Sequence, residues 1–580
     1  MLILHAILLA VLTTLARLAM LSDATNSSND NVGSVRVTAA QRKQRWLGFT
    51  TENSIIQGTY GYPPLVYWIV SHFDRKRWAQ LRYWLNYLAD TATTLLVWGA
   101  ILWLAPDLPR EVALLVALAF GLNTLLLPGV EHARVSAPNA RAMGLLFNTL
   151  WIAGLTTLVA RPDLAVPVAL AMVPLSWLTV LTSQFGMQSM VGLSVCTALV
   201  AWSPWPVVAL MAGVGSGYAV KGLGVRETLQ HKFVHWRWYS VVQRTVANAA
   251  SYRARPWRVR TAAMLTLFAS PFRNGWTLGT ELQRSAWWKM LAGVAPFLAF
   301  VGMTISAGSV DSALAAPLTR ALAIVCASAG VLFFLTTQPR LVFLGEAERY
   351  IEHALGGIAV LSVLFAAGQP ERALAAAVLG VVVAVTLLVA QLAHRQWTTA
   401  QIMMQYPALG FGGEREMLKR FVSLGVPVRI ATVPVKAAFL LHDLLLDEAM
   451  PGSERVSFYF QHVVQPGDDR FRYMMDDTVD GNEYLRDDLP ALVQKYGIDL
   501  IVVDSAWLYD HTNTAPILET LRLRQVQYTS GRFAVLSLQD LKPNTAATGA
   551  GSTVDLLFPK PKSAREIARE RAMAAAAASA

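Results

Sequence analysis

Long apolar runs recur through the first two thirds of the sequence, separated by polar stretches of very different lengths. About 20 consecutive apolar residues are enough for a helix to cross the hydrocarbon core of a bilayer. Counting apolar windows of about 15 to 22 residues predicts about eleven such helices, so we expect a mostly α fold, a polytopic transmembrane helical bundle. The predicted spans lie near 2–21, 88–105, 111–128, 142–160, 164–183, 188–201, 205–219, 289–305, 317–337, 354–368 and 373–393.

The connections between the predicted spans alternate in length. One membrane face receives only short connections, and the other receives 22–87, 129–141, 220–288, 338–353 and the tail from 394. An enzyme that builds its site on one face of a membrane needs such asymmetry, whereas a channel or a symmetric transporter has no evident need for it. The sixth and seventh spans are short and are joined by SPWP (203–206), so a broken pair or a re-entrant hairpin is an alternative there.

The pattern changes after about residue 405. Two β-branched runs bounded by Gly, Pro and Asp, at 425–435 and 497–507, predict buried strands, and 525–538 predicts a closing hairpin with Ser-Gly at its turn. Helical patterns lie near 435–449, 487–496 and 513–523. We therefore divide the chain into a transmembrane domain (1–393), a linker (394–404), a soluble C-terminal α/β domain (405–541) and a low-complexity basic tail (542–580).

The composition supports a membrane protein with anionic partners. Hydrophobic residues make up 54% of the chain and charged residues only 15%, against about 25% charged in soluble domains. The net charge of +11 favours lipid headgroups or lipid phosphates. Nucleic acid is disfavoured because the cations form no recognisable reading module. Cys196 and Cys326 both lie in apolar spans, which excludes a disulfide framework and a thiolate metal site.

A short motif, YPPL (62–65), stands in the first large loop. Two prolines oppose a helix at that point, because each lacks an N–H and restricts the residue before it. An amphipathic run follows, with a cationic cluster after it, and predicts an interfacial helix with aromatic anchors. The residues expected on its apolar face are Leu65, Val66, Trp68, Ile69 and Phe73. A plain membrane-surface linker is the alternative.

An N-terminal span, an acidic loop, a YPPL element opening a surface helix, and many further spans resemble the GT-C superfamily of polytopic glycosyltransferases. The resemblance covers about 1–393, and the α/β tail suits members with a soluble C-terminal domain. It implies an inverting hexosyl- or pentosyltransferase in a bacterial inner membrane. Such an enzyme moves a sugar from a polyprenyl-phosphate carrier to a glycan, lipid or protein acceptor of the cell envelope. No acidic Asp-X-Asp signature is intact in this sequence.

The resemblance further implies a catalytic or metal-binding carboxylate soon after the first helix. Asp23 and Asp30 are candidates, and Asp30 is the better one because it precedes a second plausible interfacial helix. An acceptor hydroxyl is a weak nucleophile, and a carboxylate can take its proton as the new bond forms. The alternative is that Asp30 simply lies in a solvated turn.

A second acidic position is expected in the next large loop, where Glu131 and His132 end the third span. Glu131 and Asp30 could share a divalent cation such as Mg²⁺ or Mn²⁺ through oxygen ligands. Neutralisation of Glu131 by Arg134 or Arg141 is the alternative.

The leaving lipid phosphate needs fixed cations, and the planar fork of arginine suits phosphate oxygens. Arg273, Arg340 and Arg349 are our candidates, although Glu346 and Arg349 could instead pair at i,i+3. Tyr60 and Tyr62 would shape the groove by which the acceptor enters. The predicted substrate-binding residues are Tyr60, Tyr62, His132, Arg273, Asn274, Arg340, Glu346 and Arg349.

Charge and resemblance disagree about sidedness. The first large loop is rich in cations, whereas the opposite face shows Arg110, Arg161 and Arg372. The positive-inside rule therefore places the large loops in the cytoplasm. The resemblance places them, with the C-terminal domain, outside, and we expect that orientation. Three alternatives stay open: a flippase or transporter of lipid-linked saccharides, a non-catalytic scaffold, and a cytoplasm-facing enzyme that uses a nucleotide-activated sugar.

Overall fold

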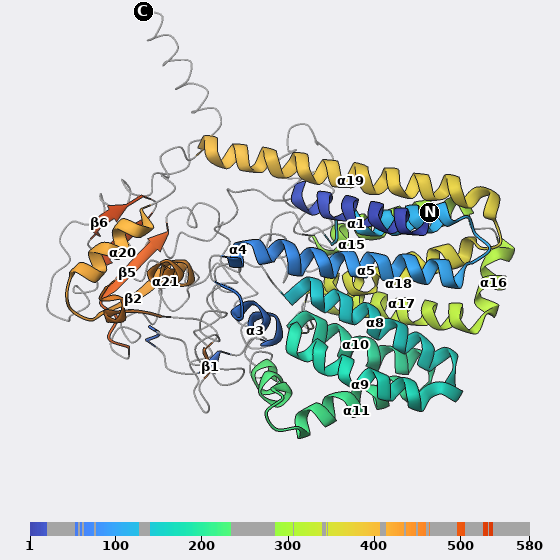
Figure 1. Cartoon of the computed structure of the whole chain (residues 1–580), viewed down its shortest axis with the longest axis horizontal. Helices are drawn as coiled ribbons and strands as arrows, with labels where there is room; N and C mark the ends of the chain where they lie inside the picture. Colours follow the sequence, from blue (N-terminus) through green and yellow to red (C-terminus); the bar gives the residue numbers. More distant parts are fainter. Residues whose placement is uncertain are drawn as a thin grey trace, which may run out of the picture. The chain divides into compact units, whose positions relative to one another are not determined.

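A computed structural model gives the arrangement of the chain (Figure 1). It describes residues 1–19, 53–55, 59–60, 63–74, 77–126, 140–233, 285–304, 307–338, 341, 344, 346–405, 413–433, 437–447, 451–459, 463–464, 496–504, 526–531 and 533–537, some of them by their backbone alone. The chain forms two compact units. One comprises Met1–Thr50 with Thr59–Gln396, and the other comprises Thr51–Gly58 with Trp397–Ala580.

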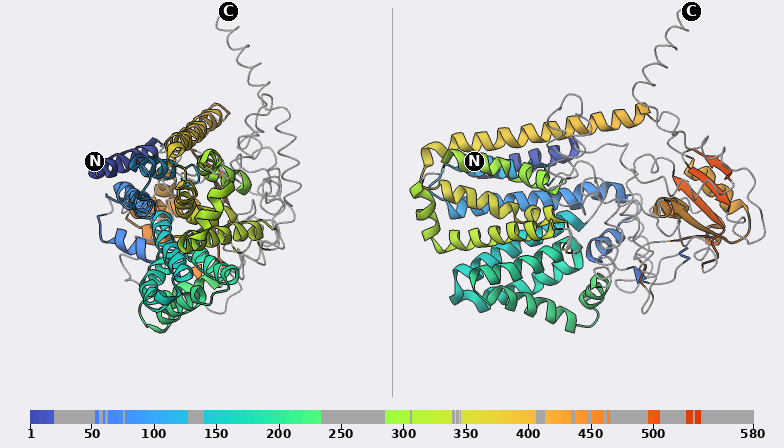
Figure 2. Two further views of the ribbon diagram at one scale, coloured as in Figure 1. Left: turned by 90° about the vertical axis from the view of Figure 1, so that its right-hand side faces the viewer. Right: turned by 180° about the vertical axis from the view of Figure 1, so that it is seen from behind.

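The first unit is a bundle of helices that lie side by side (Figure 2). Among the described residues, nine helices are long and apolar enough to cross a membrane. They are α1 (Leu2–Ala19), α5 (Tyr87–Leu104), α8 (Ala140–Ala160), α9 (Ala165–Thr182), α10 (Gln184–Ala201), α15 (Ala286–Thr304), α17 (Pro317–Thr336), α18 (Ala347–Ala366) and α19 (Pro370–Gln405). The shorter helices α6 (Arg110–Gly121) and α11 (Trp205–Ala219) take the two remaining predicted positions. The predicted polytopic bundle is confirmed.

Two local findings refine the predicted spans. The sixth span is a full helix of 18 residues, α10, and it turns into α11 through Trp202, whose backbone is left-handed (φ 50°). Helix α19 continues through 394–404, so the residues expected to link the domains are helical. The remaining helical pieces of this unit are α4 (Trp78–Leu81), a π-helical turn (Arg82–Asn86) that leads into α5, a 3-10 turn (Pro162–Leu164) and α16 (Ala307–Ala315); its one described strand is β1 (Thr59–Tyr60).

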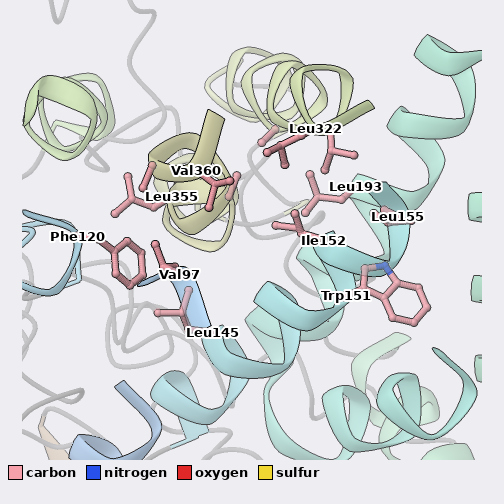
Figure 3. Close-up of a cluster of buried hydrophobic side chains, with 14 of the residues drawn as sticks. Val97, Phe120, Leu145, Trp151, Ile152, Leu155, Leu193, Leu322, Leu355 and Val360 are labelled. Carbon is pink, nitrogen blue, oxygen red and sulfur yellow. The ribbon is translucent and has the colours of Figure 1, made fainter. Parts of the chain in front are cut away.

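Helix α18 is the centre of the bundle, since 78% of its most apolar window is buried. Its Leu355 and Val360 point into a core that α5, α6, α8 and α17 complete (Figure 3). A Cβ at Gly357 would lie 3.3 Å from Leu322 of α17 and from Cys326 Sγ, so glycine lets the two helices approach closely. In contrast to the buried helix α18, helix α19 leaves a row of apolar side chains exposed, as expected of a face toward lipid. That row is Val378, Val382, Val385 and Val389.

The predicted surface helix is present as α3 (Leu65–Ser71), and Pro64 is its N-cap residue. Its buried face differs from the predicted one. Val66 and Val70 are fully buried and pack with Leu81 and Ala140, whereas Trp68 and Phe73 are 39% and 40% exposed. Within this seven-residue helix Tyr67 faces inward with Val66 and Val70, whereas Trp68 projects outward. An outward tryptophan fits an anchor at the headgroup level.

The second unit holds a five-stranded mixed sheet in the order β3-β2-β5-β7-β6. Strand β2 (Val428–Val433) pairs in parallel with β3 (Val456–Phe458) and with β5 (Leu500–Asp504). Strand β7 (Phe533–Ser537) runs antiparallel to β5 and to β6 (Val526–Ser530). Gly531 supplies the left-handed residue of the hairpin turn (φ 55°). The predicted buried strands and closing hairpin are confirmed.

The described helices of this unit are α20 (Glu414–Ser423), a 3-10 turn (Ser453–Arg455) and α21 (Ala437–Asp447). Helix α21 realises the helical pattern predicted at 435–449. The patterns at 513–523 and, apart from Tyr496, at 487–496 lie outside the described residues, as does the basic tail. Strand β4 (Val463–Val464) completes the described elements.

Candidate functional site

The first turns of four membrane helices, α8, α10, α15 and α18, meet through charged and aromatic side chains. In a span, an ionisable group costs free energy unless it is paired or used, which makes such a cluster a functional hypothesis. We name this group the N-terminal cluster and define it by its charged members and the ring between them. They are Arg141, Phe185, Lys232, Lys289, Glu346, Glu348, Arg349 and Glu352.

Arg349 is the most strongly held member of the N-terminal cluster. Its Nε donates to Glu346 Oε2 at 2.9 Å and its Nη1 donates to Glu352 Oε2 at 2.7 Å. All three side chains are largely buried, with exposures of 6% for Arg349, 12% for Glu346 and 2% for Glu352. The i,i+3 pairing of Glu346 with Arg349 that the sequence offered as an alternative is therefore present.

A second ion pair joins α15 to α18. Lys289 Nζ donates to Glu348 Oε1 at 2.8 Å, and the carboxylate is 7% exposed while the lysine is 26% exposed. Glu348 lies in the first turn of α18, where the partial positive charge of the helix end also favours a carboxylate. This pair fixes the start of α15 against the start of α18.

Phe185, in the first turn of α10, brings two arginines together. The guanidinium carbons of Arg141 and Arg349 lie 5.5 Å and 5.3 Å from the centre of its ring. Both distances are within the range of a cation–π contact. Arg141 begins α8 and is only partly buried. Arg349 is already paired with Glu346 and Glu352, so the less buried Arg141 is the guanidinium group better placed to contact an added anion.

Lys232 lies beside the same end of α10 and comes from the helical residues 225–233. Its Nζ is 3.4 Å from Gln184 Oε1, and the residue is only 4% exposed. Burial lowers the pKa of Lys232 to about 7, because the ammonium loses its hydration. Burial also lowers the pKa of the adjacent His231, and Glu227 opposes that change. Lys232 can therefore gain or lose a proton near neutral pH.

A second layer of polar contacts supports the N-terminal cluster from within the bundle. His353 Nδ1 lies 2.6 Å from Ser189 Oγ, and both residues are buried. The Tyr350 hydroxyl donates to the Leu344 carbonyl at 3.0 Å. Ser183 caps α10 by accepting from the Gly186 amide at 3.1 Å. The contact between His353 and Ser189 joins α18 to α10, while the other two bonds order the chain at the start of each helix.

The structure brings together only part of the predicted site. Glu346 and Arg349 stand in the N-terminal cluster, and Tyr60 lies in strand β1, where its backbone alone is described. The other predicted residues lie outside the described residues: Asp30, Tyr62, Glu131, His132, Arg273, Asn274 and Arg340. Within the described part of the chain, no group of three His, Cys, Asp or Glu residues could hold a metal. The proposed cation between Asp30 and Glu131 stays a prediction.

Sequence reasoning missed the roles of Lys289, Phe185 and Lys232, and it considered Arg141 only as a neutraliser of Glu131. A signal existed for Lys289 and Arg141, because each is a lone cation at the first turn of an apolar run. Lys289 and Glu348 are 59 positions apart, and periodicity alone cannot join them. Nothing in the sequence distinguishes Phe185 from the other aromatic residues of the spans.

The N-terminal cluster suits an anionic ligand. Among the described residues it gathers three cations and three carboxylates near the starts of α8, α15 and α18, and a fourth cation, Lys232, beside the start of α10. Helix starts carry a partial positive charge and unpaired N–H groups, and they bind phosphates for that reason. Arginine adds a planar, permanently charged fork for phosphate oxygens.

Comparison with known proteins gives weak matches of structure. No protein-family model matches the chain, and no curated protein matches it. Among solved structures, 92% of the chain matches 73% of the Archaeoglobus fulgidus oligosaccharyltransferase in complex with Zn and sulfate, at 11% identity and a TM-score of 0.45. The archaeal oligosaccharyltransferase AglB from the same organism, in complex with an inhibitory peptide and a dolichol-phosphate, matches at 10% identity over 92% of this chain and 74% of that chain, with a TM-score of 0.40.

A third solved structure, ArnT from Cupriavidus metallidurans bound to undecaprenyl phosphate, matches at 15% identity. The match covers 93% of this chain and 98% of that chain, with a TM-score of 0.32. Because every TM-score is below 0.5, the activity of this chain has to be inferred from its own residues.

Proposed function

We propose that this protein is an integral membrane glycosyltransferase that moves a sugar from a polyprenyl-phosphate carrier to an acceptor of the cell envelope. The observation that carries the proposal is the N-terminal cluster, in which Arg141, Lys289 and Arg349 stand at the starts of three membrane helices and Lys232 lies beside the start of a fourth. A lipid-linked donor has an apolar tail and an anionic head. A cationic site at the end of an apolar bundle matches both parts of such a molecule.

Within this proposal Arg141 is the cation that contacts the carrier phosphate. It is only partly buried and it shares the Phe185 ring with Arg349. Arg349 is fixed by Glu346 and Glu352, so it holds its side of the Phe185 ring in a constant position. As the bond between the sugar and the phosphate breaks, negative charge grows on the phosphate. Preorganised cations stabilise that charge more than they stabilise the bound donor.

The remaining roles come from the resemblance and stay proposals. Asp30 would accept the proton of the acceptor hydroxyl, and Glu131 would assist it, with or without a divalent cation. Arg273 and Arg340 would add further contacts to the phosphate, and Tyr60 and Tyr62 would line the entry of the acceptor. No step described here depends on a bound metal. The sugar and the acceptor are not specified by the described residues.

The test uses the purified full chain in lipid nanodiscs with synthetic polyprenyl-phosphate sugars, and it measures transfer and donor binding. We expect Arg141→Gln to lower kcat about 100-fold and Arg141→Lys to lower it less. Arg320→Gln is the matched control, because Arg320 is an exposed arginine of α17 outside the N-terminal cluster. If the wild type transfers sugar and Arg141→Gln transfers it equally fast, the assigned role of Arg141 is wrong. Movement of the donor across the bilayer without covalent transfer would instead favour a flippase.

A further inference from the structure

Three residues of the first large loop belong to the C-terminal unit. Ser54 pairs in parallel with Phe458 of strand β3. The Ile55 amide donates to the Phe458 carbonyl at 2.9 Å, and the Phe458 amide donates to the Asn53 carbonyl at 2.8 Å. Ser54 is only 5% exposed and Phe458 is fully buried. The loop segment 53–55 thus forms an isolated β-bridge with β3.

Asn53 is adapted to this contact. Its backbone is left-handed (φ 51°), and among the described residues only Trp202 shares that feature outside glycine. Asparagine tolerates this region better than most residues. Its side-chain amide Nδ2 donates to the carbonyls of Ser453 at 2.7 Å and Val456 at 2.8 Å. Asn53 therefore satisfies two backbone carbonyls at the turn that leads into β3.

The partner strand offers an open edge. Strand β3 ends the sheet order β3-β2-β5-β7-β6, so only one of its sides pairs with β2. An open edge presents unpaired N–H and C=O groups and invites another strand. Addition of an extended segment to such an edge is a common mode of peptide recognition. Here the added segment comes from the same chain.

We propose that the C-terminal α/β domain anchors the first large loop through segment 53–55, and that this attachment positions the loop for sugar transfer. Eight positions after Ile55 the chain reaches Pro63 and Pro64, which precede helix α3. Proline fixes the backbone angle φ, so the entry to this helix is restrained. The part concerning transfer rests on the proposed function, in which this loop supplies the base. Asn53 is a positioning residue, since it contacts the sheet.

The first readout needs no activity. Hydrogen exchange is measured on the full chain in nanodiscs at the amides of Ile55, Phe458 and Trp68. The Trp68 amide belongs to α3 and donates to the Pro64 carbonyl at 2.8 Å. Asn53→Gly keeps the left-handed backbone but removes both side-chain bonds. It should raise exchange at all three amides about 30-fold, given about 1 kcal/mol for each of the two lost bonds. The amides of β5 should be unchanged, which excludes unfolding of the domain. Lys419→Gln, an exposed change in the same unit, is the control.

The second readout is transfer. Asn53→Gly should lower kcat about tenfold and leave the KM for the lipid donor within about twofold, because the N-terminal cluster is untouched. Unchanged exchange at Ile55 and Phe458 would overturn the anchor. Faster exchange at Ile55 and Phe458 without any change at Trp68 would overturn the positioning role. This result does not depend on whether a donor is turned over. Absence of transfer by the wild type with any lipid-linked sugar would refute the proposed function alone, and the exchange results would still decide the anchor.

Discussion

The buried charges of α18 show how single residues can stay ionised within an apolar helix. Glu346, Arg349 and Glu352 follow one another at i,i+3, and both carboxylates bind the same guanidinium. Lys289 neutralises Glu348 from the neighbouring helix. Each charge therefore has its counterion fixed by backbone geometry. Removing one partner of a buried pair costs about 3–5 kcal/mol, so these residues are tied together as a set.

Lys232 gives a prediction about pH. Its native pKa is about 7 because of burial, while the unfolded chain keeps the ordinary value of about 10.4. Between pH 7 and 10 the unfolded chain binds this proton and the native chain does not, so the stability rises with pH across that window. Below pH 7 both states hold the proton, and the full penalty of burial applies. Lys232→Met should therefore raise the Tm at pH 7 and flatten its rise toward pH 10.

The measurement is thermal unfolding in detergent at several pH values, followed by tryptophan fluorescence. Lys221→Met is the matched control, because Lys221 is exposed and close in sequence, and it should leave the slope unchanged. An identical slope for Lys232→Met and the wild type would show that Lys232 is not the group responsible.

At the scale of elements, one ion pair joins three helix ends. Arg17, in the last turn of α1, bonds through Nε to Asp90 Oδ2 in the first turn of α5 at 2.9 Å. Its Nη1 also donates to the Gly121 carbonyl at the end of α6 at 2.6 Å. Both charges complement the dipoles of the helices that carry them. The carbonyls of a helix end need such donors, because they have no partner within the helix.

Asp90→Asn should lower the Tm strongly, because it leaves the guanidinium of Arg17 buried without its counterion, at a cost of about 3–5 kcal/mol. The double variant Arg17→Met with Asp90→Leu should recover most of that loss, since apolar residues of similar size need no counterion. Thermal unfolding of both variants in detergent provides the measurement. If the double variant unfolds at or below the temperature of the single variant, the pairing explanation is wrong.

The sequence predicts the elements well and the site poorly, and α18 shows why. The predicted span starts at 354, whereas the helix starts at Ala347. Four charged or titratable residues in the first turns lower the local hydropathy, yet they remain helical because they pair with one another and with Lys289. Apolar periodicity detects burial in lipid but not compensation between charges. For the same reason the contacts of Phe185 with two arginines appear only once the helices are placed.

At the scale of the whole molecule, the open question is which side of the membrane carries the C-terminal domain. Use of a polyprenyl-phosphate carrier predicts that the domain faces outward, and the positive-inside rule predicts that it faces the cytoplasm. Val426 is 56% exposed in the C-terminal unit, and Asp107 is exposed in a short connection of the bundle. In a background without Cys196 and Cys326, we expect Val426→Cys to react with an impermeant thiol reagent in intact cells. Asp107→Cys should react only after lysis.

Reaction of the two positions in the reverse order would place the domain in the cytoplasm and would turn attention to a nucleotide-activated donor. Reaction of both positions in intact cells would mean that an even number of spans, and not an odd number, separates them. Only the reversed order would contradict the proposed use of an extracytoplasmic carrier.

The pairing of Asn53 with the turn before β3 also sets an order of events during synthesis. Asn53 precedes its partner Ser453 by 400 residues. At about 5–20 residues per second, a ribosome needs roughly 20–80 s to translate that interval. Throughout this time the nascent chain inserts helix after helix while segment 53–55 has no strand to join. Segment 53–55 therefore cannot form its bridge until residues 453–458 have been translated, and a chain terminated before them never forms it.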